Sequence, residues 1–147
     1  MAERNTLELQ LYRKWFNASK FFLEHVTTDV EGYGMTVDNF RILELLYSEE
    51  EQYTVQKISE KLHIASGSIT YVVNRLVKQG YVKKEPCTTD GRASYVVLTL
   101  EGEAMIHDIL PKHVEYISSK TGDISDEEKY VLIDLLDKLE ICFDKSE

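Results

Sequence analysis

The sequence has few of the residues that cross-link or interrupt a fold: 147 residues include two cysteines, two prolines and seven glycines. Cys87 and Cys142 lie far apart, in no metal or redox spacing, which favours a reducing cytoplasm. The low Gly and Pro content excludes collagen-like and low-complexity chains. There is neither an apolar run of about 18 residues, as a membrane span needs, nor a signal-peptide core. We therefore expect one cytoplasmic domain without membrane contact.

Motifs that carry catalysis are also missing. There is no phosphate-binding glycine loop, no zinc-protease pair and no nucleophile motif. The histidines form no ligand set, and His107 and His113 are six residues apart, on roughly opposite sides of a helix. The glutamate-rich segments fit solvated helix faces better than acid–base pairs. We expect no enzyme, no metal and no cofactor.

Charge is distributed unevenly along the chain. The formal net charge is -9, yet residues 55–99 carry seven basic and three acidic side chains. The flanks, residues 1–54 and 100–147, are both acidic. A basic middle between acidic flanks indicates a local surface for a polyanion, with the flanks facing away from it.

Amphipathic helical patterns cover most of the first fifty residues. Residues 6–30 form a long apolar and aromatic pattern that ends at Gly32-Tyr33-Gly34. Thr36 is expected to cap a second helix. The polar residues 48–52 are expected to form a solvated connection.

Two short helical patterns with a tight turn between them follow, over residues 54–62 and 66–79. We expect Ser66 to cap the second helix and Gly80 to end it with a positive φ. The residues turned inward are Ile69, Leu76 and either Val72 or Val73. This arrangement is typical of a helix-turn-helix.

The period then changes to that of strands. Residues 81–85 and 94–98 are rich in β-branched and aromatic residues, and turn formers separate them. A hairpin directly after a helix-turn-helix is a wing. The predicted fold class is mainly α with a small β-hairpin wing: a winged helix-turn-helix DNA-binding lobe over residues 36–99, with helical regions over 1–31 and 100–147.

Two more helices are expected after the wing. Thr99 caps the first, which is interrupted by a kink at Pro111 because proline removes a backbone hydrogen bond. Ser125 and Glu128 form a capping box for the second. Its apolar residues in line are Leu132, Leu139, Phe143 and either Leu135 or Leu136.

The polar face of the helix over residues 66–79 is a candidate DNA-reading surface. Hydroxyl and amide groups can meet base edges, whereas Arg, Lys and Tyr can hold phosphates. Its candidate residues are Ser66, Ser68, Thr70, Tyr71, Asn74, Arg75 and Lys78. A solvated polar face is the alternative.

The wing favours the DNA-reading interpretation. Its candidate residues are Lys83, Lys84, Asp90 and Arg92. Arg92 at the tip suits a narrow minor groove, which concentrates negative potential. Asp90 is interpreted as a turn former that also pairs with Arg92.

Several of these segments resemble the MarR family of bacterial transcriptional regulators. The matching residues are 64–70 and 74–82 for the recognition helix and the entry to the first strand, and 90–92 with 98–102 for the wing. The likeness covers residues 35–140 closely and the first helix more loosely. It implies a homodimer, held by the first and the last two helices, that binds double-stranded DNA at a palindromic operator.

Two positions depart from the family pattern. Gly91 replaces the first of two adjacent basic residues in the wing, and Tyr71 stands where many members have a basic residue. Both changes bear on the strength and the base preference of DNA binding.

The resemblance also suggests an input signal. Ligand-responsive members bind small aromatic acids, phenols or quinones, and residues 109–113 and 66–71 are similar to quinone- and electrophile-responsive repressors of Gram-positive bacteria. The candidate pocket residues, which have an ordinary core role as their alternative, are Tyr12, Trp15, Phe16, Tyr33, Tyr47 and His113.

A thiol is the rival sensor. Peroxide-sensing members use a cysteine near the start of the first helix, which has none here. Basic neighbours on the wing are expected to lower the pKa of the Cys87 thiol, although a passive wing residue is the alternative. Cys142, among apolar residues, is expected to be buried and inert.

Two functions from different classes stay open. One is a dimeric transcriptional repressor with a small-molecule or redox input. The other is a winged-helix protein-interaction module without an operator. The basic middle segment and Arg92 favour the first, and the salt dependence of duplex binding distinguishes them.

Overall fold

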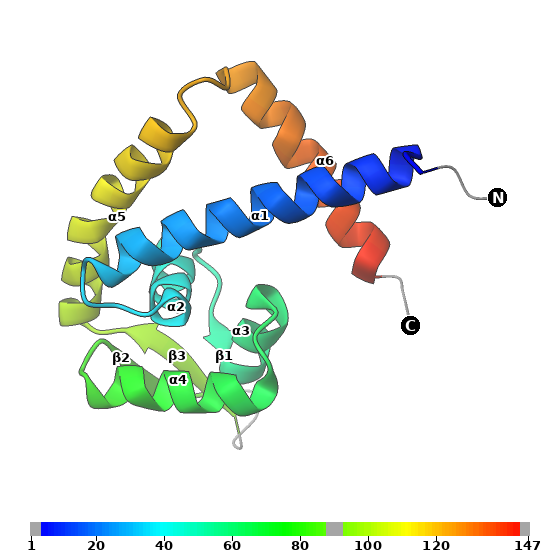
Figure 1. Ribbon diagram of the computed structural model, residues 1–147. Helices are drawn as coiled ribbons and strands as arrows, with labels where there is room; N and C mark the ends of the chain where they lie inside the picture. The colour runs from blue at the N-terminus through cyan, green and yellow to red at the C-terminus, as the bar shows by residue number, and fades with distance from the viewer. Residues whose placement is uncertain (1–3, 88–92, 145–147) are drawn as a thin grey trace. The chain divides into compact units, whose positions relative to one another are not determined.

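The computed structural model describes residues 4–87 and 93–144. Within these ranges the helices are α1 (Leu7–Glu31), α2 (Val37–Ser48), α3 (Val55–Leu62), α4 (Ser66–Lys78), α5 (Leu100–Lys120) and α6 (Asp126–Asp144). The strands are β1 (Tyr53–Thr54), β2 (Val82–Pro86) and β3 (Ser94–Leu98). Figure 1 shows the elements. The chain divides into two compact units, Met1–His113 and Val114–Glu147, which we describe separately.

The three strands form one antiparallel sheet in the order β1-β3-β2. The hairpin of β2 and β3 was predicted, but β1 was not: Tyr53 pairs with Val96 of β3, directly after the segment expected to be only a connection. A strand of two residues is too short to show an alternating pattern. Tyr53 is only 3% exposed. Burial, followed by the charges of Glu51 and Glu49, raises the pKa of its phenol.

The core of the first unit lies where α2, α3 and α4 pack around this sheet (Figure 1). Both Val72 and Val73 are buried, so the choice between them was unnecessary. Burying an aliphatic side chain of this size stabilises a fold by about 1.5–3 kcal/mol. The largest fully buried side chains are Ile42, Leu43, Ile58, Ile69, Leu76 and Ile106, with Val30, Val73, Val82 and Val96.

The helix-turn-helix has a different cap from the one predicted. Ala65 is the N-cap of α4 and makes no side-chain hydrogen bond, so the expectation for Ser66 was wrong. Ser66 is already the first helical residue, and its hydroxyl is therefore one position too late to cap. The turn is held instead by the Ser59 hydroxyl, which donates to the Ile64 carbonyl at 2.6 Å, and by His63 in the left-handed region at φ 54°.

The end of α4 and the start of α5 meet at two glycines. Gly80 has φ +84°, as predicted for the residue that ends the helix. A Cβ on Gly102 would lie 2.0 Å from the Tyr81 carbonyl oxygen, so only glycine fits there. Thr99 caps α5, since its hydroxyl accepts from the Gly102 N–H at 3.1 Å and donates to the Gly80 carbonyl at 2.6 Å.

Helix α5 is continuous through Pro111. The expectation that the proline interrupts the helix was wrong. Proline removes one N–H donor from the helix ladder. The loss of this donor does not end the helix, and the Pro111 ring is exposed.

The second unit contains the end of α5 and the helix α6. The predicted capping box is present: the Ser125 N–H donates to Glu128 Oε1 at 3.0 Å, and the Glu128 N–H donates to Ser125 Oγ at 3.1 Å. These hydrogen bonds lower the pKa of Glu128. No residue of α6 is buried, and Cys142 is exposed. The expectation of a buried Cys142 was wrong: its thiol is exposed, like most of the apolar side chains of α6.

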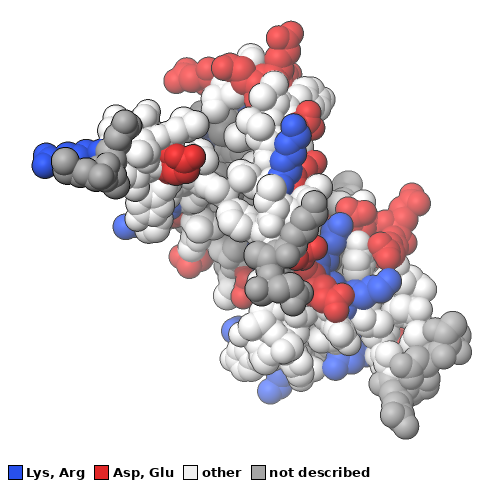
Figure 2. All heavy atoms as spheres, turned by 90° about the vertical axis from the view of Figure 1, so that its right-hand side faces the viewer, with Lys and Arg blue, Asp and Glu red and all other residues white. Residues whose placement is uncertain are grey.

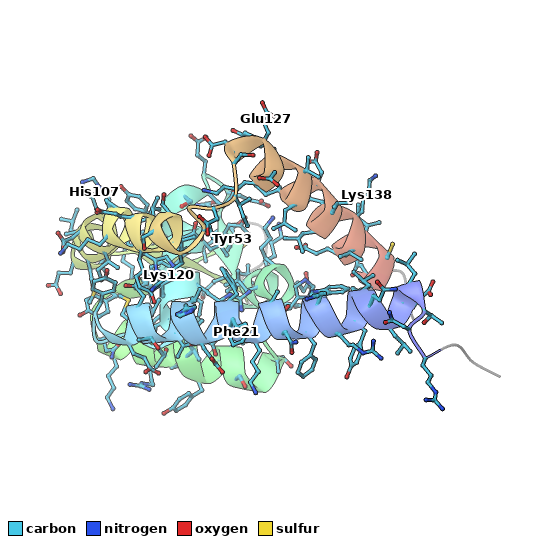
Figure 3. All side chains as sticks on the ribbon, turned by 45° about the horizontal axis from the view of Figure 1, so that its top comes forward. Phe21, Tyr53, His107, Lys120, Glu127 and Lys138 are labelled. Atoms are coloured by element: carbon cyan, nitrogen blue, oxygen red, sulfur yellow. The ribbon has the colours of Figure 1, made fainter. Side chains whose placement is uncertain are left out.

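Helix α1 is also largely uncovered. Val30 is its only buried residue, and large apolar side chains are exposed along its length, Phe21 among them (Figure 3). None of the helices in residues 4–87 and 93–144 has both the length and the apolar character of a membrane span.

Candidate nucleic-acid interface

Helix α4 has two faces of opposite character. One carries the four buried residues Ile69, Val72, Val73 and Leu76. The other carries all seven residues predicted to face DNA, each of which is exposed: Ser66, Ser68, Thr70, Tyr71, Asn74, Arg75 and Lys78. The helix contains no acidic residue. Its exposed face can therefore approach a polyanion without like-charge repulsion from its own side chains.

Tyr71 and Arg75 form a pair on this face. The Arg75 guanidinium lies 5.9 Å from the centre of the Tyr71 ring, within the range of a cation–π interaction. Tyr71 is 63% exposed. Tyr71 itself carries no charge, but Arg75, one turn later on the helix, places a positive charge beside its ring.

The start of α2 lies beside α4, which the sequence did not predict. A shallow surface hollow is shared by the two helices, and its lining residues are Thr36, Asp38, Asn39, Gly67, Ser68, Tyr71, Val72 and Arg75. Thr36 caps α2 as predicted, accepting from the Asn39 N–H at 3.1 Å. No local pattern could have found this proximity, because the two segments are far apart in sequence.

The two lysines of β2 have different partners. Lys83 forms an ion pair with Glu85 at 3.4 Å, whereas Lys84 donates from Nζ to Asn74 Oδ1 at 3.2 Å. Residues two apart share a face of a strand, so Lys83 and Glu85 lie on the face opposite to that of Lys84. Lys84 is therefore hydrogen-bonded to α4, whereas Lys83 is paired within its own strand.

Of the remaining wing candidates, Asp90 and Arg92 lie outside the described residues. Cys87 directly follows β2, and its N–H donates to the Ala93 carbonyl at 3.1 Å. Its side chain is buried, with 8% exposure. A reagent therefore has restricted access to this thiol.

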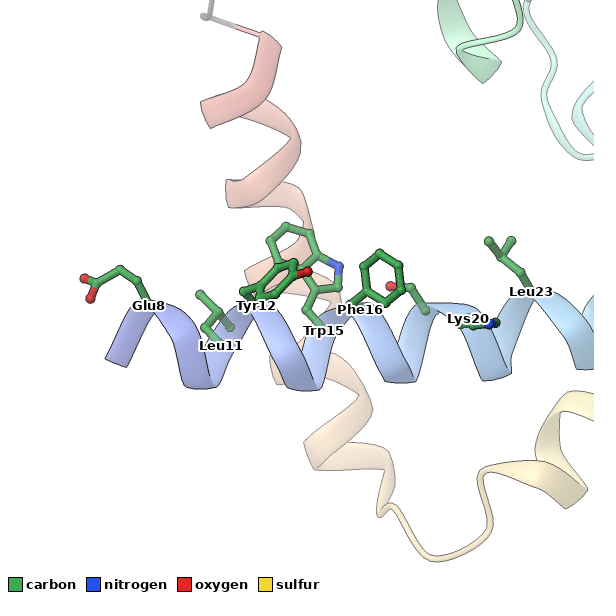
Figure 4. A pocket seen from close by; sticks show the side chains of 8 residues that line it. Glu8, Leu11, Tyr12, Trp15, Phe16, Lys20 and Leu23 are labelled. Atoms are coloured by element: carbon green, nitrogen blue, oxygen red, sulfur yellow. The ribbon is translucent and has the colours of Figure 1, made fainter. Parts of the chain in front are cut away.

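The six predicted pocket residues do not line one cavity. Tyr12, Trp15 and Phe16 line an open hollow on one side of α1, and Leu11 and Leu23 project from the same side (Figure 4). The other three candidates do not line it: Tyr33, Tyr47 and His113.

The remaining pocket candidates are held by polar contacts. The Tyr47 hydroxyl lies 2.6 Å from Nδ1 of His107 on α5. His113 and Tyr33 instead meet at Asp29, whose carboxylate lies 2.6 Å from His113 Nδ1 and 3.4 Å from the Tyr33 hydroxyl. Sequence reasoning missed Asp29, because one acidic residue on a long helix has no local signal.

Charge on the surface has to be assigned element by element. Figure 2 shows one face of the molecule, on which Lys and Arg side chains lie among Asp and Glu side chains. The acidic side chains of α6 are on its first turn, at Asp126, Glu127 and Glu128, and farther along the helix. The basic residues of α4 and β2 therefore form a local basic surface on a chain whose net charge is negative.

Comparison with known proteins identifies the family. The sequence profile of the MarR family matches residues 33–93, from the end of α1 to the start of β3. The HTH-type transcriptional regulator MhqR of Bacillus subtilis (strain 168) is 30% identical over 131 residues, which are 89% of this chain and 90% of that protein. The chain belongs to the MarR family.

Solved structures of the family share the fold. AbsC, a MarR family transcriptional regulator from Streptomyces coelicolor, superposes with a TM-score of 0.87 at 18% identity, over 99% of this chain and 100% of that one. Sco3205 from the same organism, solved in complex with DNA, gives a TM-score of 0.81 at 21% identity, over 95% and 90%. The predicted family and fold class are confirmed.

Proposed function

We propose that this MarR family member is a transcriptional regulator that binds double-stranded DNA with α4 and the wing. The observation that carries the proposal is the exposed face of α4, which has hydroxyl, amide, aromatic and basic groups and no acidic one. The likeness to Sco3205, which was solved in complex with DNA, supports the same function.

Each part of the surface has a role in this proposal. Ser68 and Thr70 lie near the start of α4, the part of a recognition helix that contacts base edges. Tyr71, Arg75 and Lys78 are suited to phosphates, which position the protein without reading sequence. Arg92 is assigned to the minor groove beside the major-groove site.

We propose further that the functional form is a homodimer. The lobe of residues 36–99 binds DNA, and residues 1–31 and 100–147 supply the dimer contacts. The exposed apolar side chains of α1 and α6 support this division, because a two-fold partner would cover them. Such a dimer places two recognition helices about 34 Å apart, one turn of DNA, and reads a palindromic operator.

The proposed role is repression that a small phenolic or quinone-like ligand releases. Both recognition helices must meet grooves in register, so a ligand that prefers another spacing shifts the population off DNA. The candidate contacts are aromatic with a few polar groups, as small-ligand sites usually are. Tyr12, Trp15 and Phe16 line the hollow on α1, whereas the other candidates make polar contacts elsewhere in the first unit: Tyr33, Tyr47 and His113.

The test of DNA binding combines heparin retention with duplex titrations at several salt concentrations. We expect retention on heparin and an affinity that falls steeply with salt, since each neutralised phosphate adds about one unit to the logarithmic slope. Arg92→Ala should weaken binding most at operators with AT-rich flanks. Absence of both retention and duplex binding would favour a winged-helix module for protein contacts.

A further inference from the structure

The hydrogen bond between Lys84 of β2 and Asn74 of α4 fixes which groups Asn74 offers to a ligand. A lysine ammonium has three donors and no acceptor, so the atom that faces it must be the amide oxygen of Asn74. The amide nitrogen, with its two N–H groups, is left for another partner. Both side chains are exposed.

This arrangement disfavours the usual recognition of adenine by asparagine, because one lone pair of the Asn74 oxygen is taken and the Lys84 ammonium beside it repels a second N–H donor. That contact is bidentate: the amide oxygen accepts from the adenine amino group while the amide nitrogen donates to the ring. With its oxygen engaged by Lys84, Asn74 presents donors. Lys84 adds its remaining N–H groups and a positive charge. The pair is therefore matched to an anion with several acceptor oxygens.

The surroundings point to the same kind of ligand. Lys78 lies one turn after Asn74 on α4 and is also exposed. Glu85 forms an ion pair with Lys83, and both residues lie on the face of β2 opposite to that of Lys84. The charge of Lys84 has no acidic partner among the ion pairs of the described residues.

We propose that Asn74 and Lys84 together bind one backbone phosphate of DNA, and that Asn74 does not read a base. The inference rests on the proposed DNA-binding function and assigns one of its contacts. Asn74 lies in the third turn of α4, behind the first turns that enter the groove. The pair joins the recognition helix to the wing strand through the same phosphate.

The experiment compares base preference with affinity. Full-length wild type and Asn74→Ala are each used to select duplexes from a random-sequence DNA library, and the selected duplexes are titrated with both proteins. We expect the same base preferences, with Asn74→Ala weaker by about three- to tenfold on every duplex. Its salt slope should be unchanged, because no charge is removed. Lys84→Ala should lower the slope by about one.

Two controls support the reading of these results. Lys57→Ala removes an equal charge from α3, where Lys57 forms an ion pair with Glu51 at 3.3 Å, and should change affinity less than twofold. The double variant Asn74→Ala/Lys84→Ala should lose less than the product of the single effects, because the two residues share a partner. Circular dichroism checks that each variant is folded, which we expect since Lys57, Asn74 and Lys84 are exposed.

A methylphosphonate scan of the selected duplex identifies the phosphate. At one position, replacing the phosphate by a neutral methylphosphonate should give wild type and the double variant the same affinity for the duplex. The proposal is overturned if Asn74→Ala loses its preference at one base pair, or if no such position exists. Failure of the wild type to bind any duplex would instead overturn the proposed function itself.

Discussion

Asp29 of α1 and His113 of α5 are 84 residues apart in sequence, and their side chains lie 2.6 Å apart, from Oδ2 to Nδ1. Both side chains are nearly buried, with 11% and 7% exposure. The Phe40 ring of α2 packs against the imidazole, with 4.6 Å between ring centres. One carboxylate thus connects α1 to α5 beside the first residues of α2, within the first unit.

We predict that Asp29→Ala lowers the free energy of unfolding by about 3 kcal/mol, because it leaves a buried imidazole without its partner. The matched control is Asp108→Ala, which removes the exposed partner of Lys112 on α5 and should change the free energy by less than about 0.5 kcal/mol. Denaturant unfolding at one fixed protein concentration measures both. Equal effects of the two substitutions would contradict this prediction.

The parts of the fold that the sequence predicted correctly depend on neighbouring residues. Thr36 and Ser125 each accept a hydrogen bond from the backbone N–H three residues later in the chain. Gly80 ends α4 because glycine readily adopts a positive φ. Strand β1 depends instead on pairing between Tyr53 and Val96, which belong to distant segments. Local patterns cannot reveal such a partner.

The same limit applies to the candidate site. The exposed face of α4 follows from helical periodicity, and every residue predicted for it is exposed; Gly67 and Val77 are exposed as well. The different contacts of Lys83 and Lys84 depend on the fold, because Lys83 pairs with Glu85 of its own strand whereas Lys84 reaches Asn74 of α4. The exposure of Cys142 was not predicted because apolar residues on a helix indicate burial whether the partner is the same chain or another one.

The dimer proposal gives a second prediction. Replacing Leu136 and Leu139 of α6 by glutamate should yield a monomer in sedimentation equilibrium, because charge is introduced among apolar side chains that a partner would cover. Duplex affinity should fall with the loss of the second recognition helix. Glu60→Lys, an exposed change on α3, should remain dimeric. A wild type that is monomeric at micromolar concentration would contradict the prediction.

A third prediction separates ligand binding from thiol chemistry. Cys87 is buried, so we expect salicylate-like compounds and a quinone to release operator DNA from both wild type and Cys87→Ser. Fluorescence anisotropy of a labelled operator duplex measures the release. Cys142→Ser, which alters the exposed thiol of α6, is the control for modification elsewhere. If quinone release is lost only in Cys87→Ser, the thiol is the sensor.

The last prediction concerns pH and the capping box of α6. The hydrogen bonds from Ser125 lower the pKa of Glu128 in the folded chain relative to the unfolded chain. The carboxylate therefore stabilises the fold above its unfolded pKa, and this contribution disappears as the pH falls through the lower folded pKa. The difference in unfolding free energy between wild type and Glu128→Ala should be constant near neutral pH and shrink below about pH 4.

Glu128→Gln is the matched control, because its amide oxygen can accept the Ser125 N–H but does not titrate. The difference in unfolding free energy between Glu128→Gln and Glu128→Ala should not depend on this titration. Thermal and denaturant unfolding from pH 7 to pH 3 would follow all three proteins. A wild-type advantage over Glu128→Ala that persists unchanged at pH 3 would show that the charge of Glu128 is not what stabilises the start of α6, since the carboxyl group is protonated there.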